Sequence, residues 1–155
     1  MRKLIVFLMF LSVLFFGINA NANVFNDRTF FVSLRSDKAN LRTGPGSEYP
    51  IKYVYHLKGL PLEVLGEYES WYNIRDKDGD EGWINQNLVT KKRTVVIING
   101  TQILYSSNNK DSRPLNRLEK NVIAKLKKCK KDFCKVEIKK RRGWIKKENI
   151  WGIKK

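Results

Sequence analysis

Histidine, cysteine and acidic residues are scarce in this chain of 155 residues. It has one histidine, two cysteines, and 15 Asp or Glu against 31 Lys or Arg. A serine or cysteine hydrolase needs a nucleophile beside a base that a third group orients. The single histidine, His56, alternates with Tyr55 and Leu57 in a strand-like stretch, which favours a structural or surface role. The sequence therefore predicts a protein that is not an enzyme.

Metal-binding patterns are lacking as well. The two cysteines have no neighbouring ligands, because His56 lies in the other half of the chain. Residues 76–81 read Asp-Lys-Asp-Gly-Asp-Glu, but an EF-hand needs glycine at the sixth place, where this chain has Glu81. We predict a two-residue hairpin turn at Asp78-Gly79 instead, and we expect neither a metal nor another cofactor.

Long apolar runs are confined to the N-terminus. Residues 1–3 are Met-Arg-Lys, residues 4–18 are almost wholly apolar, and residues 19–22 read Asn-Ala-Asn-Ala. This is the three-part layout of a secretory signal peptide, cut after Ala22. A membrane anchor is the alternative, but spanning a bilayer takes roughly 20 apolar residues. We predict an exported chain with no transmembrane segment after the cut.

Helical periodicity is nearly absent after Ala22. Short runs of β-branched and aromatic residues recur between Gly, Pro, Asn and Asp. Strands are expected at residues 29–34, 39–42, 51–57, 62–67, 71–75 and 81–84, and residues 95–98 open a second set. Many short strands at this spacing predict an all-β sandwich or small barrel.

A weak internal repeat divides the chain. Residues 71–74, Trp-Tyr-Asn-Ile, begin 12 positions before Trp83 of a Gly-Trp-Ile motif. Residues 133–136, Phe-Cys-Lys-Val, begin 11 positions before Trp144 of a second Gly-Trp-Ile motif. The basic residues 91–93 lie between the two copies. Each half is therefore expected to form one copy of the same β unit.

These motifs resemble the bacterial SH3 family. The family hallmark Asn-x-Arg-x-Gly-Pro-Gly is matched by residues 40–46, and its aromatic-led and Gly-Trp-Ile strands by residues 71–74 and 82–84. The second copy has Ser-Ser-Asn-Asn at 106–109 in place of Gly-Pro-Gly. Residues 31–34, 59–64 and 151–153 resemble a tandem subfamily of exported Gram-negative proteins.

The resemblance implies two tandem SH3-like β-barrels after the signal peptide of residues 1–22. Barrel 1 is expected over residues 28–90 and a degenerate, basic barrel 2 over residues 94–153. The resemblance also implies a location in the periplasm of a Gram-negative bacterium.

Cys129 and Cys134 flank a four-residue connection that suits a hairpin. Non-hydrogen-bonded partners of an antiparallel pair have Cα atoms about 4.5 Å apart, within the roughly 4.4–6.8 Å that a disulfide needs. Export brings the chain into an oxidising compartment. We predict a disulfide here; free buried thiols and a metal site are the alternatives.

Positive charge belongs to the second half. Residues 33–90 carry 7 Lys or Arg and 9 Asp or Glu, a net −2, whereas residues 91–155 carry 21 and 5, a net +16. One predicted hairpin offers a candidate anion-binding surface. Its residues are Lys128, Lys130, Lys131, Lys139, Lys140, Arg141 and Arg142. A solvated face of a lysine-rich protein is the alternative. Export argues against nucleic acid, so an anionic envelope surface is the expected partner.

Aromatic residues gather in the first repeat. A hypothetical ligand groove comprises Tyr49, Tyr53, Tyr55, Trp71, Tyr72 and Trp83. SH3-type barrels bind peptides in such grooves; rings that merely cover a thin core are the alternative. We predict a non-catalytic binding module for a cell-envelope ligand, a peptidoglycan peptide or glycan or an envelope protein. A scaffold for another periplasmic protein and a cell-wall hydrolase are the competing hypotheses.

Overall fold

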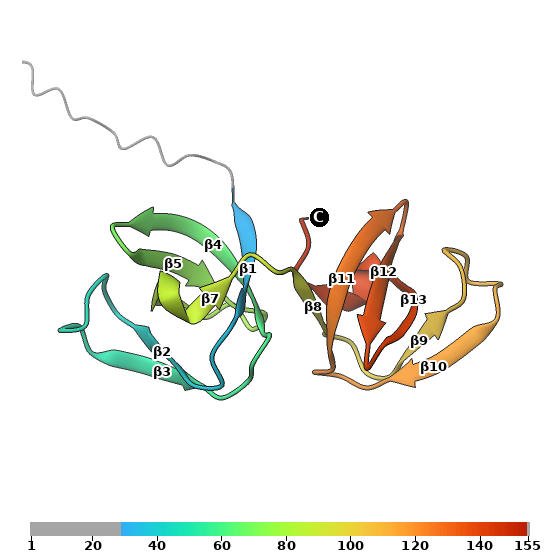
Figure 1. Cartoon of the computed structure of the whole chain (residues 1–155), viewed down its shortest axis with the longest axis horizontal. Coiled ribbons are helices and arrows are strands. Elements are labelled where there is room, and N and C mark those ends of the chain that lie inside the picture. The colour runs from blue at the N-terminus through green and yellow to red at the C-terminus, as the bar shows by residue number, and fades with distance from the viewer. Residues whose placement is uncertain (1–28, 155) are drawn as a thin grey trace, which may run out of the picture.

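The chain forms two antiparallel sheets that follow one another along the sequence (Figure 1). The computed structural model describes residues 29–154, and the predicted signal peptide lies outside them. Within these residues no helix is long and apolar enough to cross a membrane. The all-β prediction is confirmed, since the described chain contains only strands, turns and two short 3-10 helices.

The first sheet, called barrel 1 below, contains seven strands. They are β1 (Phe30–Leu34), β2 (Ala39–Arg42), β3 (Ile51–Tyr55), β4 (Pro61–Tyr68), β5 (Trp71–Arg75), β6 (Glu81–Asn85) and β7 (Val89–Thr90). Their order across the sheet is β3-β2-β6-β5-β4-β1-β7, and η1 (Gln86–Leu88) precedes the last strand. The expected strands are found within a residue or two of their predicted ends.

The second sheet, barrel 2, repeats this plan. Its strands are β8 (Thr94–Ile97), β9 (Gln102–Tyr105), β10 (Pro114–Leu118), β11 (Ile123–Lys130), β12 (Phe133–Ile138), β13 (Arg141–Lys146) and β14 (Ile150–Trp151). The order β10-β9-β13-β12-β11-β8-β14 is that of barrel 1 with every number raised by seven, and η2 (Lys147–Asn149) takes the place of η1. The internal repeat suggested by the sequence is thus a repeat of topology.

Each barrel wraps around its own apolar core. Leu41, Leu62, Ile74 and Ile84 are fully buried in barrel 1, and Val95, Ile97, Val136 and Ile150 in barrel 2. Burying each such side chain contributes roughly 1.5–3 kcal/mol. Alternation along the strands turns these residues inward and polar residues outward, as the period of two requires.

The glycines of the two Gly-Trp-Ile motifs let neighbouring strands approach closely. A Cβ on Gly82 would lie 2.8 Å from both the Arg42 carbonyl oxygen and Leu41 Cγ, and one on Gly143 would lie 2.4 Å from Leu104 Cγ. Real Cβ atoms essentially never approach other atoms so closely. Any larger residue at Gly82 would collide with β2, the strand paired with β6. A larger residue at Gly143 would collide in the same way with β9, the strand paired with β13.

The turn between β5 and β6 differs from the prediction. The two-residue hairpin expected at Asp78-Gly79 is wrong, because β5 ends at Arg75 and β6 begins at Glu81. The five residues between them are organised by Asp76, whose Oδ1 accepts hydrogen bonds from the Asp78 and Asp80 amides at 2.9 and 3.0 Å. A side chain that satisfies turn amides in this way stabilises a wider loop than glycine alone would select.

The barrels contact each other directly. The rings of Phe31 in β1 and Trp151 in β14 meet edge-on with centroids 5.5 Å apart. Ile123, the first residue of β11, packs against the core of barrel 1. These apolar contacts join the ends of the two sheets.

Candidate functional site

The outer face of β5 and β6 brings together two of the predicted groove tryptophans. Strand pairing sets Asn73 opposite Trp83 and Arg42 opposite Trp83 from the other side. Trp71, two residues before Asn73, is a diagonal neighbour of Trp83 on the same face. Both tryptophans are half-buried, so each presents part of its ring to solvent, and Trp83 lies beside Arg42.

The loop between β2 and β3 brings Tyr49 close to this face. A Cβ on Gly44 would lie only 2.3 Å from Tyr49 Cδ1, so the tyrosine ring lies directly on the glycine. The Arg42 guanidinium donates a hydrogen bond to the Tyr49 carbonyl oxygen at 2.6 Å. Tyr49 itself is 41% exposed. The Gly-Pro-Gly stretch thus serves as a platform for an exposed aromatic ring.

Tyr53 and Tyr55 lie on β3, the edge strand of the sheet, and differ in exposure. Tyr53 is 55% exposed, whereas Tyr55 is 4% exposed. Their rings meet edge-on at 4.9 Å. The Tyr55 hydroxyl donates to Asp76 Oδ2 at 3.0 Å, and burial, together with the Asp76 charge, raises the pKa of Tyr55. Tyr55 therefore supports Tyr53 from the core.

Tyr72 faces the opposite side of β5. It pairs with Ile84, packs against the core of barrel 1, and meets the ring of Phe30 edge-on at 5.7 Å. Partial burial raises the pKa of Tyr72. The predicted groove residues are consequently divided between two faces. Those on the outer side, with Arg42 and Ile51 beside them, are called the aromatic face below; they are Tyr49, Trp71 and Trp83.

The equivalent face of barrel 2 is covered. Trp144 occupies the position of Trp83 but is only 9% exposed. It pairs with Tyr105 and with Lys135, whose ammonium lies 6.0 Å from the indole centroid. Phe133 packs edge-on against Tyr105 at 6.1 Å. The same sheet topology therefore presents aromatic rings to solvent in barrel 1 and encloses them in barrel 2.

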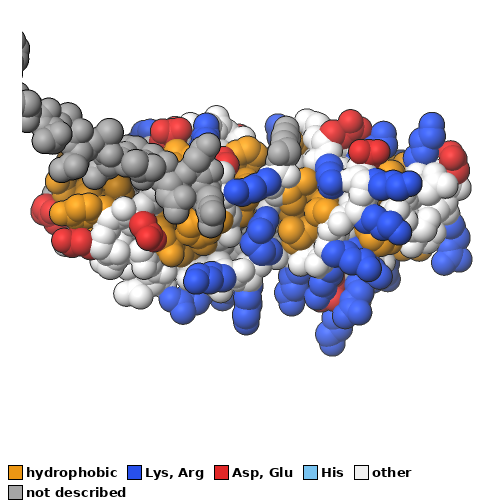
Figure 2. Space-filling model, turned by 90° about the horizontal axis from the view of Figure 1, so that it is seen from above, with side chains coloured by type: hydrophobic (Ala, Val, Ile, Leu, Met, Phe, Trp, Pro, Cys, Tyr) orange, Lys and Arg blue, Asp and Glu red, His pale blue; other side chains and the backbone are white. Residues whose placement is uncertain are grey.

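The basic residues are gathered over barrel 2, as Figure 2 shows, but the predicted anion-binding set is not one patch. Lys130 and Lys131 lie at the β11–β12 turn, and Lys139, Lys140 and Arg141 at the β12–β13 turn. Six residues of β12 separate these turns, roughly 20 Å at the usual rise of a strand. The hairpin thus carries a positive cluster at each end.

Lys128 and Arg142 lie between the two clusters. With Lys127 and Lys135 they border a hollow of about 220 Å³. Glu137 accepts a hydrogen bond from Arg142 Nε at 2.7 Å and lies 3.2 Å from Lys127 Nζ. The pKa of Glu137 is lowered, first by the bond from Arg142 and then by that from Lys127. Arg142 is therefore engaged by a carboxylate and less available to an external anion.

The turn lysines hold an uncommon backbone. Lys139 and Lys140 have φ of 47° and 68°. A two-residue hairpin turn with both φ positive favours Asn-Gly, because a Cβ costs roughly 1–2 kcal/mol per residue in the left-handed region. Two ammonium groups are thus held at the tip of this hairpin at a cost in stability.

The structure contains the expected disulfide between Cys129 and Cys134, which are paired residues of β11 and β12. His56 is exposed, just after β3. Among residues 29–154, no three His, Cys, Asp or Glu side chains are grouped so that they could hold a metal ion.

No sequence pattern marks Arg42 and Ile51 as members of the aromatic face. Arg42 was noticed only as part of a motif, and Ile51 only as the start of a strand. Strand register pairs Arg42 with Trp83 on one side and with Ile51 on the other. No local signal identifies Arg42 as a neighbour of Trp83, because this pairing joins residues that lie about 40 positions apart in the chain.

Comparison with known proteins identifies the family. The profile of the bacterial SH3 domain matches residues 35–91 and again 100–152. No curated protein matches the sequence. Similar solved structures include NlpC2 from Trichomonas vaginalis, with 11% identity over 81% of this chain and 48% of that one at a TM-score of 0.37.

An NlpC/P60 family protein from Bacillus cereus has 15% identity over 78% of this chain and 55% of that one, at a TM-score of 0.35. The chain thus spans about half the length of these structures. The two profile matches fall on the two sheets in turn, and the chain belongs to the bacterial SH3 domain family, with two such domains in tandem.

Proposed function

We propose that the protein is a non-catalytic binding module of the cell envelope, and that the aromatic face of barrel 1 holds a peptidoglycan peptide or glycan. Membership of the bacterial SH3 family supports a role in binding cell-wall material. One observation carries the choice of barrel 1. Trp71 and Trp83 are half-buried on one face, with Arg42 beside Trp83, whereas the equivalent Trp144 is enclosed.

The chemistry of the face suits such a ligand. Aromatic rings supply apolar contact area with few internal rotations to lose, and a guanidinium recognises the carboxylates of a stem peptide through paired donors. The Tyr49 ring extends the same surface over Gly44. A peptide or sugar chain lying across β5 and β6 would contact rings and charge together.

Barrel 2 would add electrostatic attraction. Residues 91–155 carry a net charge of +16. The β11–β12 turn exposes Lys130 and Lys131, and the β12–β13 turn exposes Lys139 and Lys140. Envelope polymers rich in phosphate or carboxylate would be drawn to these groups. Such attraction is screened by salt over a Debye length of roughly 8–10 Å at physiological ionic strength.

A periplasmic location and a non-catalytic role are part of the proposal. The disulfide is of the kind found in oxidising compartments, and the sequence predicts export. Both cysteines of the chain are joined in that bond, and its single histidine is exposed. These residues offer no thiolate nucleophile beside a positioned base.

Co-sedimentation with purified peptidoglycan sacculi tests the proposal. The processed chain should pellet with sacculi at low salt, and Trp71→Ala should weaken retention about tenfold or more, as expected for an aromatic hot spot. Leu115→Ala is the matched control, since it removes an exposed apolar side chain from barrel 2. Absence of pelleting at low salt, or equal retention of the two variants, would contradict the proposal.

A scaffold that binds a periplasmic protein is the second candidate. The edge strand β3 exposes Ile51 (49%) and Tyr53 (55%), and an unpaired edge with apolar side chains can accept a strand from another chain. A pull-down from envelope extract that depends on Tyr53 and persists after removal of sacculi would favour this candidate.

A further inference from the structure

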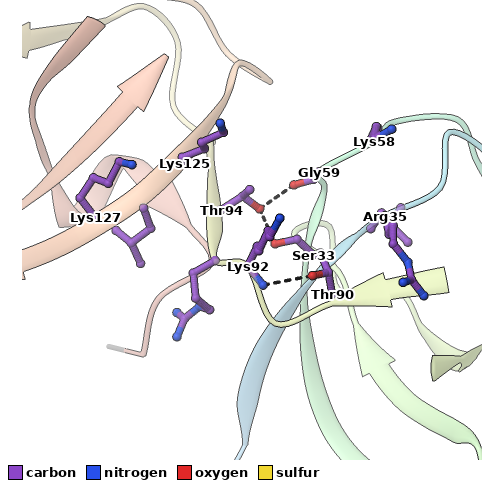
Figure 3. Close-up of a pocket in the computed structure, with 12 residues that line it drawn as sticks. Ser33, Arg35, Lys58, Gly59, Thr90, Lys92, Thr94, Lys125 and Lys127 are labelled. Carbon is purple, nitrogen blue, oxygen red and sulfur yellow. Dashed lines mark hydrogen bonds between the residues drawn. The ribbon is translucent and has the colours of Figure 1, made fainter. Parts of the chain in front are cut away.

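A cleft lies where the two barrels meet, away from the aromatic face. Its volume is about 660 Å³, within the roughly 300–1,000 Å³ of typical small-ligand sites. Its walls come from β1, β7 and the β3–β4 turn of barrel 1, from the linker, and from β8 and β11 of barrel 2 (Figure 3). The cleft therefore exists only when both barrels are docked.

Hydrogen bonds across the junction fix its shape. The Thr94 hydroxyl lies 2.6 Å from the Ser33 hydroxyl and donates to the Gly59 carbonyl oxygen at 2.6 Å (Figure 3). Arg93 donates to the Gly152 carbonyl oxygen at 2.6 Å, and its guanidinium lies 5.5 Å from the Phe31 centroid. These hydrogen bonds join residues 35 to 61 positions apart and hold the walls at a set spacing.

The charges that border the cleft are all positive. Six cations line it, and no carboxylate from residues 29–154 does. The six are Arg35, Lys58, Lys92, Arg93, Lys125 and Lys127. Like charges gathered in a cleft with low-dielectric walls focus a positive potential that attracts anions.

Three of these cations have partners among residues 29–154, and three have none there. Arg35 donates to the Asn87 carbonyl oxygen, Arg93 is bound as above, and Lys127 pairs with a carboxylate of its own hairpin. Across the described chain, no ion pair is formed by the remaining three. They are Lys58 of the β3–β4 turn, Lys92 of the linker and Lys125 of β11. Each comes from a different segment of the chain.

Leucine side chains and hydroxyl groups make up most of the remaining lining. Leu34, which is 2% exposed, and Leu126, which is partly buried, line the cleft with the aliphatic stems of the lysines. The hydroxyls of Ser33 and Thr94 are bonded to each other, so the ammonium groups are the principal donors left for a ligand. The site thus combines several positive charges with an apolar lining.

From this combination we infer that the inter-barrel cleft binds a phosphate ester that carries an apolar group. A phosphate monoester holds about 1.5–2 negative charges and three acceptor oxygens, which matches several ammonium groups better than a single carboxylate does. Lysine binds phosphate as a point charge without demanding a fixed planar geometry. The inference goes beyond the proposed function and uses none of the residues of the aromatic face.

Titration calorimetry of the processed chain, with amide NMR to locate binding, tests the inference. Dihexanoyl phosphatidic acid below its micelle concentration represents a lipid source, and 1-naphthyl phosphate represents a soluble source. Glycerol 3-phosphate lacks the apolar group, and dihexanoyl phosphatidylcholine lacks net charge. Binding of either apolar phosphate, with shifts at the Gly59, Thr94 and Lys125 amides, is the expected result and identifies the source.

Paired variants separate the cleft from the general charge of barrel 2. Lys58→Gln with Lys125→Gln should lower the affinity about tenfold or more, since each change removes a charged donor to the phosphate; a tenfold loss is about 1.4 kcal/mol. Lys110→Gln with Arg117→Gln removes the same charge from the β9–β10 loop and from β10, the opposite edge of barrel 2, and should change the affinity less than about threefold.

Four outcomes would overturn the inference. They are no binding of either apolar phosphate, equal losses in the two double variants, equal binding of glycerol 3-phosphate, and binding to phosphatidylcholine of similar strength. Sacculus binding by the Lys58/Lys125 variant is expected to persist, which keeps this test separate from that of the aromatic face.

Discussion

Replacing Asp76 by alanine should destabilise barrel 1 strongly, because its carboxylate is a buried connection between distant strands. Asp76 is 5% exposed. Its Oδ2 accepts from the Tyr55 hydroxyl of β3 at 3.0 Å, and its Oδ1 accepts from two amides of the β5–β6 turn. The side chain thus ties the edge strand to a turn beyond the neighbouring strands.

The magnitude follows from what each partner loses. The Tyr55 hydroxyl would remain buried without a partner, at a cost of about 1–3 kcal/mol. The two turn amides can turn to water, so their loss adds about 1 kcal/mol. A total near 3 kcal/mol is a large share of the roughly 3–9 kcal/mol expected for a domain of this size. The melting temperature should fall by about 12–24 °C.

Urea and thermal unfolding followed by tryptophan fluorescence measure the effect. Asp78→Ala is the matched control, because Asp78 is exposed in the same turn and its side chain contacts only the neighbouring Lys77 among the described residues; it should change stability by less than about 0.5 kcal/mol. In a Tyr55→Phe background, Asp76→Ala should cost about 1–2 kcal/mol less than in the native chain. Equal stability of the Asp76→Ala and Asp78→Ala variants would refute the reasoning.

Three further predictions concern the rest of the fold. Replacing Cys129 and Cys134 by serine should destabilise barrel 2 by about 2 kcal/mol, the chain-entropy value for so short a loop, as measured by urea unfolding; an unchanged midpoint would contradict it. Lys139→Asn with Lys140→Gly should stabilise barrel 2 by about 1–2 kcal/mol, because the turn already has positive φ at both positions; a lower midpoint would contradict the assigned turn. Burial, reinforced by a nearby carboxylate, raises the pKa of Tyr55, so above about pH 10 the unfolded chain loses a proton that the folded chain keeps, and stability should fall with rising pH. Unfolding midpoints between pH 9 and 11 should fall less steeply in Tyr55→Phe than in the native chain, and identical slopes would contradict the prediction.

Local sequence patterns predict much of the fold. Alternating residues and turn residues set the strand positions, as in residues 39–42 and 71–75, which match β2 and β5. The four-residue connection, together with the predicted export to an oxidising compartment, predicts the Cys129–Cys134 bond that the structure contains. The two Gly-Trp-Ile motifs predicted the repeat that the two sheets share. These features depend on neighbours in the sequence, so the sequence alone determines them.

The candidate site depends on contacts that the local pattern does not contain. Tyr53 and Tyr55 are two residues apart on one strand, so strand alternation predicts the same face for both. Packing nevertheless exposes Tyr53 and buries Tyr55. The basic run looks continuous, but the length of β12 moves Lys130 and Lys139 to opposite ends of a hairpin. Strand register, which joins residues about 40 positions apart, decides that Arg42 lies beside Trp83.

The sequence by itself determined that this chain is a tandem of small β-barrels with its positive charge in the second. Only the tertiary structure decided which tryptophans face solvent, and only it created the cleft between the barrels. The physical reason is the same in both cases. Exposure and cleft geometry are set by packing between distant segments, such as Ser33 with Thr94, 61 residues apart. The relative orientation of the two barrels produces no periodic pattern in the sequence, so the sequence does not predict it.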